Sequence, residues 1–159
     1  MKMRRKLIPT LQIAQTECGL CCVRTILKYY GFDISITELR QIEEPGRDGL
    51  NTKQLKKLLQ KFNLTSNTYK INNPSAFKVI DFPVIAFWKG YHFVCIEKIE
   101  NNHAFIMDPS IGRVKIDLKD FFENFSVIIS FSKTYFSFSK SFIWIRCNNN
   151  LRKVFKKIF

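Results

Sequence analysis

The spacing of apolar residues changes near Asn63, and this change limits the possible folds more than any other feature of the sequence. Before it, apolar residues recur at the spacing of amphipathic helices; after it, they form short β-branched and aromatic runs separated by turn residues. Helices followed by strands predict an α+β fold, in which N-terminal helices pack on a C-terminal antiparallel β-sheet. The length of 159 residues fits one such domain.

Local signals place three helices and six strands in this frame. The first helix begins at Cys18, carries apolar residues at helical spacing and ends before Gly31. The second and third helices each begin with the spacing of a capping box, Ser35 with Glu38 and Asn51 with Gln54. The predicted strands are 66–71, 83–88, 92–99, 104–107, 113–116 and 127–131.

The charge of the chain favours anionic partners. The formal net charge is +13, with 26 Lys and Arg against 13 Asp and Glu, which suits polyanions, anionic lipid or acidic peptides. We do not expect nucleic acid, because the aromatic residues fall at core spacing instead of alternating with Lys and Arg on one strand face. The sequence contains no glycine-rich phosphate loop, so we expect no bound ATP, and we predict no cofactor.

The cysteines indicate a reducing environment. The chain has five Cys, an odd number, and its basic N-terminus is not followed by the apolar run of a signal peptide. The apolar runs are also too short to span a bilayer. These features predict a cytoplasmic protein with free thiols, in which the reactivity of each cysteine matters more than disulfide pairing.

Cys18 is the cysteine best placed for nucleophilic chemistry. It lies at the predicted start of a helix, where unpaired N–H groups and the positive end of the helix dipole favour a thiolate. Taken alone, the position also suits a buried, inert thiol. A cysteine nucleophile needs a base, and the chain contains only two histidines. His92 starts an apolar strand, where its ring can project into a cleft, whereas His103 follows a predicted Asn-Asn hairpin turn and is expected to be solvated.

Asp108 is the candidate partner of His92. A neutral imidazole needs a hydrogen-bond partner that fixes its tautomer. Asp108 ends one predicted strand and can reach across a strand pair to His92. It also precedes Pro109, so ordinary turn chemistry is the alternative explanation for this carboxylate.

Two other functions of the same cysteines are less well supported. Cys18 and Cys21 have the spacing of a redox dithiol, but that motif expects a preceding strand, and only a short basic stretch precedes them. A zinc site would add His92 and Cys95, yet these two residues would point to opposite faces of one strand. We therefore expect no metal site.

The order of these features resembles a known family. A Cys-Gly helix start, a strand-borne His and an Asp-Pro pair are similar to the leader peptidase domains at the N-terminus of bacteriocin and lantibiotic exporters. The resemblance spans roughly residues 8–132. Its motifs are QIAQTECG at 12–19, YYG at 29–31, GRDG at 46–49, PVIAFW at 83–88, HFV at 92–94 and DPSIGR at 108–113.

This resemblance implies a papain-like cysteine peptidase fold and a role for each site residue. Cys18, His92 and Asp108 would form the catalytic triad, and Gln12 would contribute to the oxyanion hole. The implied substrate is a bacteriocin or lanthipeptide precursor with an amphipathic leader that ends in Gly-Gly or Gly-Ala. We therefore expect a cysteine endopeptidase coupled to export; the alternative is a catalytically silent module that binds leaders and recruits cargo to an exporter. Cys21 departs from the small residue that is usual in the family, and is either a small apolar residue or a second reactive thiol.

The expected organisation is a basic tail over 1–7, the peptidase domain over 8–134 and a basic, aromatic tail over 135–159. In the second tail, apolar residues between Leu151 and Phe159 share one helical face opposite basic residues, which suits either a membrane surface or a frayed surface helix. Members of the resembled family continue into membrane helices and a nucleotide-binding domain. The expected partners are these parts of an ABC exporter, in the same or another chain, and the anionic inner face of the bacterial membrane.

Overall fold

The computed structural model describes residues 6–71 and 73–133 of the chain. Its helices are the 3₁₀ helices η1 (Gln15–Glu17) and η2 (Pro74–Val79) and the α-helices α1 (Cys18–Tyr29), α2 (Ile36–Ile42), α3 (Thr52–Gln60) and α4 (Leu118–Asn124). Its strands are β1 (Leu64–Tyr69), β2 (Val84–Trp88), β3 (His92–Glu100), β4 (His103–Asp108), β5 (Gly112–Asp117) and β6 (Phe125–Lys133). The strands form one antiparallel sheet in the order β1-β6-β2-β3-β4-β5, which confirms the predicted α+β class.

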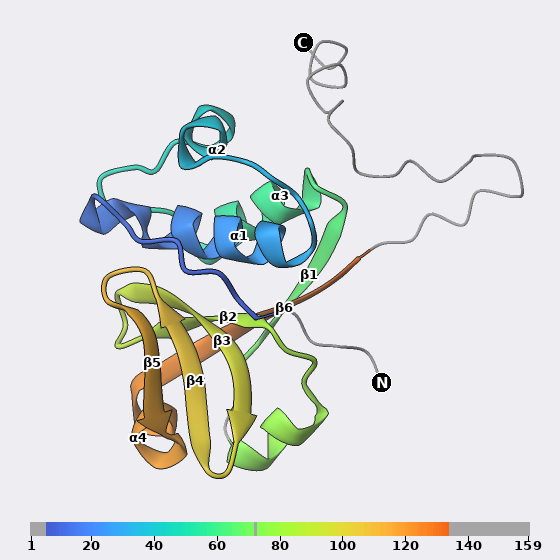
Figure 1. The fold of residues 1–159 in the computed structure, drawn as a ribbon, viewed down its shortest axis with the longest axis vertical. Coiled ribbons are helices and arrows are strands. Elements are labelled where there is room, and N and C mark those ends of the chain that lie inside the picture. The colour runs from blue at the N-terminus through green and yellow to red at the C-terminus, as the bar shows by residue number, and fades with distance from the viewer. Residues whose placement is uncertain (1–5, 72, 134–159) are drawn as a thin grey trace, which may run out of the picture.

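The helices α1, α2 and α3 form a layer over one side of the twisted sheet, as Figure 1 shows. Alternate residues of β2 and β3 enter two separate apolar clusters. Ile85 and Phe93 join the cluster that contains the helices, whereas Ala86 and Val94 join a second cluster with Phe121 of α4. Because successive side chains of a strand point to opposite faces, the sheet is buried on both sides, and these strands are apolar at consecutive positions.

The predicted helix starts are confirmed in atomic detail. The Ser35 hydroxyl accepts a hydrogen bond from the Glu38 N–H at 3.1 Å, and the Glu38 carboxylate accepts one from the Ser35 N–H at 2.9 Å. Asn51 and Gln54 exchange the corresponding pair, each at 3.0 Å. Each capping box gives a side-chain acceptor to two backbone N–H groups at a helix N-terminus that would otherwise lack a partner, so its helix begins at the residue that the sequence predicts.

The structure also differs from the sequence prediction. Three short elements were not predicted, η1, η2 and the seven-residue α4, because one or two turns carry too little periodicity to be recognised. The turn between β3 and β4 consists of Asn101 and Asn102, both with positive φ. His103 begins β4 directly after this turn, is half-buried and has its Nδ1 2.7 Å from the Asn101 carbonyl in an exposed contact, so its ring stays in reach of solvent as predicted.

The N-terminal part of the described chain belongs to the core. Leu7 is 2% exposed and lies in the helix-side cluster, so the packed domain includes a residue that the sequence analysis assigned to the tail. The predicted tail over 135–159 lies outside the described residues. Within residues 6–71 and 73–133, no helix has both the length and the apolar character needed to cross a membrane.

Candidate active site

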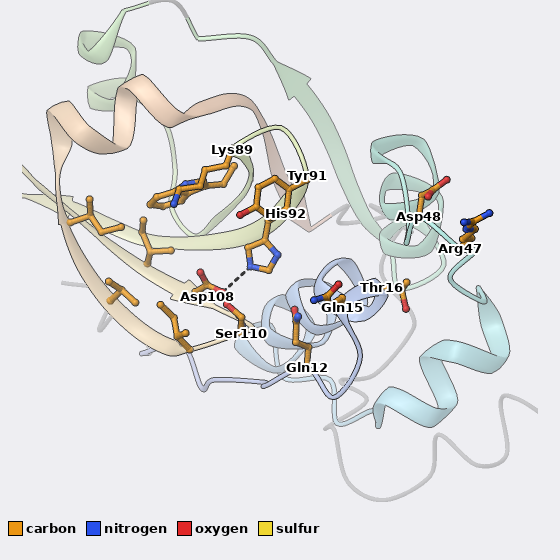
Figure 2. A pocket seen from close by; sticks show the side chains of 15 residues that line it. Gln12, Gln15, Thr16, Arg47, Asp48, Lys89, Tyr91, His92, Asp108 and Ser110 are labelled. Atoms are coloured by element: carbon orange, nitrogen blue, oxygen red, sulfur yellow. Dashed lines mark hydrogen bonds and ion pairs between the residues drawn. The ribbon is translucent and has the colours of Figure 1, made fainter.

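His92 and Asp108 meet at one end of the sheet. β3 begins at His92 and β4 ends at Asp108, and because the two strands are antiparallel neighbours, these ends lie side by side. Both residues fall on the sheet face of Val94 and Ile106, two positions along their strands. His92 Nε2 lies 2.8 Å from Asp108 Oδ1, the contact drawn as a dashed line in Figure 2.

The turn after β4 holds the Asp108 carboxylate in its ionised form. The Ser110 N–H and hydroxyl both donate to Asp108 Oδ1, at 2.8 Å and 2.6 Å. Burial alone would raise the pKa of Asp108, but the hydrogen bonds from His92 and Ser110 outweigh it and hold the pKa below its usual value. The Asp-Pro turn and the contact with His92 are therefore both present, and Ser110 is a supporting residue that the sequence analysis missed.

Cys18 is the first residue of α1 and is 6% exposed. Burial favours the neutral thiol, yet the pKa of Cys18 is lowered, because hydrogen bonds with His92 and with the backbone of Phe93 and Gly19 favour the thiolate more strongly. Gly19 lets this turn approach α3 closely, since a Cβ there would lie 3.1 Å from Leu55 Cδ2. The helix start thus holds Cys18 beside His92 within a packed interface.

The imidazole of His92 lies between the two groups. The pKa of His92 is raised to about 9. The hydrogen bond with Asp108 is the largest cause and the one with Cys18 the second, and together they outweigh the opposing effect of burial. Because Nε2 contacts Asp108, Nδ1 is the ring nitrogen left for the Cys18 sulfur. The lowered pKa of Cys18 and the raised pKa of His92 both favour a thiolate–imidazolium pair over a neutral thiol and a neutral imidazole.

The other described cysteines are buried thiols. Cys18, Cys21, Cys22 and Cys95 are all free. Burial raises the pKa of Cys21 to about 12 and raises that of Cys22 well above the usual value. Cys21 is therefore a small apolar residue of the core and not a second reactive thiol. No group of three or more His, Cys, Asp or Glu side chains within the described residues is arranged to hold a metal ion.

A cleft of about 600 Å³ opens beside His92 and Asp108. Figure 2 shows Gln12 and Gln15 on the side of α1 and Lys89 and Tyr91 on the opposite side. The lining residues are Gln12, Gln15, Thr16, Arg47, Asp48, Trp88, Lys89, Tyr91, His92, Ile106, Asp108, Ser110, Ile111, Val114 and Ile116. The Gln12 N–H donates to the Pro109 carbonyl at 2.8 Å, and Gln12 Oε1 is buried without a partner among the described residues. Cys18 itself does not line the cleft, but its partner His92 does.

Glu17 shapes the loop between Gln12 and Cys18, and the sequence analysis missed it. This carboxylate is almost fully buried, accepts hydrogen bonds from the Ile13 and Ala14 N–H groups at 3.2 Å each, and pairs with Arg40 of α2. Burial would raise the pKa of Glu17, but Arg40 and the backbone N–H groups lower it, so the carboxylate is ionised. The only signal in the sequence was an acidic residue three positions after Ala14, at the start of a helix.

Comparison with known sequences gives one family and several curated relatives. Residues 6–135 match the Peptidase C39 family. A lacticin-481/lactococcin-DR transport/processing ATP-binding protein from Lactococcus lactis subsp. lactis is 33% identical over 150 residues, which cover 92% of this chain and 22% of the relative. A lactococcin-G-processing and transport ATP-binding protein from the same organism is 27% identical, over 75% of this chain and 18% of the relative. The chain thus spans about a fifth of the length of these relatives.

Solved structures share the fold. A double glycine motif protease from an AMS/PCAT transporter, in complex with its leader peptide, superposes with a TM-score of 0.78 at 28% identity, over 84% of this chain and 96% of that chain. The peptidase domain of Streptococcus ComA, a bifunctional ABC transporter involved in quorum sensing, superposes with a TM-score of 0.72 at 20% identity, over 81% and 98%. Both superpositions confirm the papain-like fold expected from the resemblance.

Proposed function

Because the chain belongs to the Peptidase C39 family, and so is a cysteine peptidase domain, we propose that it cleaves the leader from a bacteriocin or lanthipeptide precursor after a Gly-Gly or Gly-Ala pair. One observation carries this proposal: Cys18, His92 and Asp108 lie in a hydrogen-bonded line, and His92 and Asp108 line a cleft that Gln12 also lines. The relatives that process and transport bacteriocins, and the related protease bound to a leader peptide, support the choice of substrate.

The proposed reaction begins with attack of the Cys18 thiolate on the scissile carbonyl carbon. The negative charge that develops on the carbonyl oxygen accepts hydrogen bonds from the Gln12 side-chain amide and from the Cys18 N–H at the start of α1. Each such donor stabilises the transition state by roughly 3 kcal/mol. The His92 imidazolium then gives its Nδ1 proton to the leaving amine, which departs as the new N-terminus of the mature peptide.

Hydrolysis of the resulting thioester completes the cycle. Neutral His92 takes a proton from water, the hydroxide oxygen adds to the thioester carbonyl, and the C–S bond breaks to release the leader with a C-terminal carboxylate and the Cys18 thiolate. Asp108 holds the ring orientation throughout, because its contact with Nε2 leaves Nδ1 directed at the reacting atoms. The lowered pKa of Cys18 favours its thiolate, which supports a peptidase over a catalytically silent leader-binding module.

Asp108 should set the alkaline limit of activity. We expect kcat/KM to rise as the thiolate–imidazolium pair forms and to fall as His92 loses its proton near pH 9. Contact with Asp108 is the largest cause of the raised pKa, so Asp108→Asn should move the falling limb to lower pH. It should also lower kcat/KM, though less than His92→Ala does. Cleavage rates of a Gly-Gly leader peptide from pH 5 to 10 test this, and an unmoved alkaline limb would exclude this role for Asp108.

Recognition of the leader is proposed to use charge as well as shape. Family leaders are amphipathic and often acidic, and the net charge of +13, with Arg47 and Lys89 on the cleft rim, would steer such a peptide toward the site. The proposed cellular position is the cytoplasmic face of the membrane, next to the membrane and nucleotide-binding parts of an ABC exporter. These parts belong either to the same chain or to another.

The sequence of the tail over 135–159 motivates a membrane contact that can be tested separately. Four basic residues, Arg152, Lys153, Lys156 and Lys157, stand between apolar residues at helical spacing, and each could add about 1 kcal/mol of attraction to anionic lipid at low salt. We expect the full chain to sediment with phosphatidylserine vesicles at low salt and a chain ending at Ser139 to sediment far less. Equal, salt-independent sedimentation of both would contradict the contact, and cleavage of a soluble leader peptide should be nearly equal for both.

A further inference from the structure

Gln12 lies on a segment that has no regular secondary structure to hold it. Residues 6–14, here called the N-terminal strap, precede η1 and form neither helix nor strand. Figure 1 shows the strap in dark blue, running from the sheet toward the start of α1. Residues without a helix or sheet ladder need other partners for their backbone groups, and those partners determine where the segment lies.

The far end of the strap is held by two charged side chains of the sheet. The Leu7 N–H donates to Glu97 Oε1 at 3.4 Å, and Arg113 Nη2 donates to the Leu7 carbonyl at 2.8 Å. Arg113 Nη2 also lies 3.2 Å from Glu97 Oε2, so the two side chains bind each other as well as the strap. We call Glu97 and Arg113 the clasp. The clasp satisfies both backbone groups of Leu7, whose side chain is buried in the core.

The pairing of the strands places Glu97 and Arg113 next to the strap. The β3–β4 register shifts between Ile96 and Lys98, so Glu97 lies in a β-bulge and has no partner in β4. Arg113 of β5 pairs with Met107, which faces the helix-side cluster that contains Leu7. The Glu97 and Arg113 side chains are 15% and 39% exposed, so water screens their contacts only in part. Glu97 therefore lies on β3, the strand that begins at His92, and Arg113 lies on β5, which pairs with the strand that ends at Asp108.

Besides the Glu17 carboxylate, which accepts from the Ile13 and Ala14 N–H groups, two further contacts hold the strap nearer the cleft. Arg24 of α1 donates from Nη1 to the Thr10 hydroxyl at 3.1 Å, and the Gln12 N–H donates to the Pro109 carbonyl at 2.8 Å. The anchor at Pro109 adjoins Asp108, so a change there would also disturb the proposed triad. The clasp is different, because it touches the strap five residues away from Gln12 and contacts none of the other residues proposed to react.

We propose that Glu97 and Arg113 are positioning residues for catalysis, which act by holding the strap so that the Gln12 amide faces the oxyanion. The inference rests on the proposed peptidase function and adds a determinant of transition-state stabilisation to it. Hydrogen bonds with a charged partner are stronger than neutral ones, which suits the clasp to fix a segment without regular structure. Loss of the clasp should therefore displace Gln12 and leave the Cys18–His92 pair intact.

The expected signature is a fall in kcat without a change in Cys18 reactivity. Replacing Arg113 with methionine keeps the length of the side chain and removes its hydrogen bonds. We expect Arg113→Met to lower kcat about 10- to 100-fold, as small misplacements of catalytic groups do, with KM little changed. The rate at which iodoacetamide alkylates Cys18 should equal that of the wild type, because alkylation requires the thiolate and no oxyanion hole. Arg113→Lys should recover part of kcat. Lys115→Met, which likewise replaces a cationic side chain of β5 with methionine, should leave kcat at the wild-type value.

The test is a double-mutant cycle on the full 159-residue chain with a Gly-Gly leader peptide. In a Gln12→Ala background, Arg113→Met should cause no further loss of kcat, because the donor that the clasp positions is already absent. Equal losses in both backgrounds, an unchanged kcat in Arg113→Met, or a parallel fall in Cys18 alkylation would each overturn the positioning role. A wild-type chain that fails to cleave the peptide would overturn the proposed function together with this inference, whereas a cleaving wild type with additive losses would overturn this inference alone.

Discussion

Cys18→Ala is expected to lower kcat for cleavage of a Gly-Gly leader peptide by at least about 10⁴-fold, since loss of a catalytic nucleophile removes the covalent route entirely. Binding of a fluorescently labelled leader should remain close to that of the wild type, because Cys18 is 6% exposed and contributes little contact surface. Steady-state cleavage and fluorescence anisotropy measure the two quantities separately.

Cys21→Ala is the matched control for this change. Cys21 lies on the same helix, is fully buried, and has a pKa raised to about 12, so it is neutral at the pH of the assay. Its replacement should cost some stability through lost packing and leave most of kcat. Comparable losses for Cys18→Ala and Cys21→Ala would mean that packing of α1, and not a nucleophile at Cys18, accounts for the effect.

His92→Ala is expected to have a comparable effect, with a loss in kcat/KM of about 10³- to 10⁴-fold or more. The hydrogen bond from His92 lowers the pKa of Cys18, and in the proposed mechanism His92 also supplies the proton to the leaving amine. The variant should therefore also show slower alkylation of Cys18 by iodoacetamide at neutral pH, because less of the thiol is ionised. The alkylation rate separates this variant from changes that disturb only the oxyanion hole.

The control for the second prediction is His103→Ala. His103 begins β4 at its far end from Asp108, and its Nδ1 lies beside the Asn101 carbonyl in the hairpin. This variant should retain cleavage and alkylation near wild-type rates. If His103→Ala lost activity and His92→Ala did not, the assignment of the base would be wrong, and so would the inference from the position of His92 at the strand start.

Local chemistry in the sequence predicted much of the fold. The capping boxes at Ser35 and Asn51 mark two helix starts, and the apolar runs at 83–88 and 92–99 mark the strands β2 and β3. The same signals were insufficient for α4, whose seven residues depend on the Asp117 cap and on packing of Phe121 into the second cluster. Elements stabilised mainly by tertiary contacts leave a weak trace in sequence.

The candidate site was likewise predictable from the sequence only in part. Cys18, His92 and Asp108 could be proposed from helix and strand ends, and the structure brings all three together. The part of Gln12 was implied only by the family resemblance, because nothing in its local sequence points to the cleft. Contacts such as Glu17 with Arg40 and Leu7 with Arg113 join residues far apart in the chain, so no spacing rule could have found them.

Mass spectrometry of the cleavage products can establish whether the chain hydrolyses a leader at a double-glycine site by means of Cys18. A synthetic precursor with an acidic, amphipathic leader ending in Gly-Gly is incubated with the chain, in parallel with a precursor whose second glycine is replaced by leucine. We expect two products from the first precursor, the leader ending in Gly-Gly and the peptide that follows it, and no product from the leucine precursor or with Cys18→Ala. A cut at another bond, equal cleavage of the leucine precursor, or the same products from Cys18→Ala would contradict it.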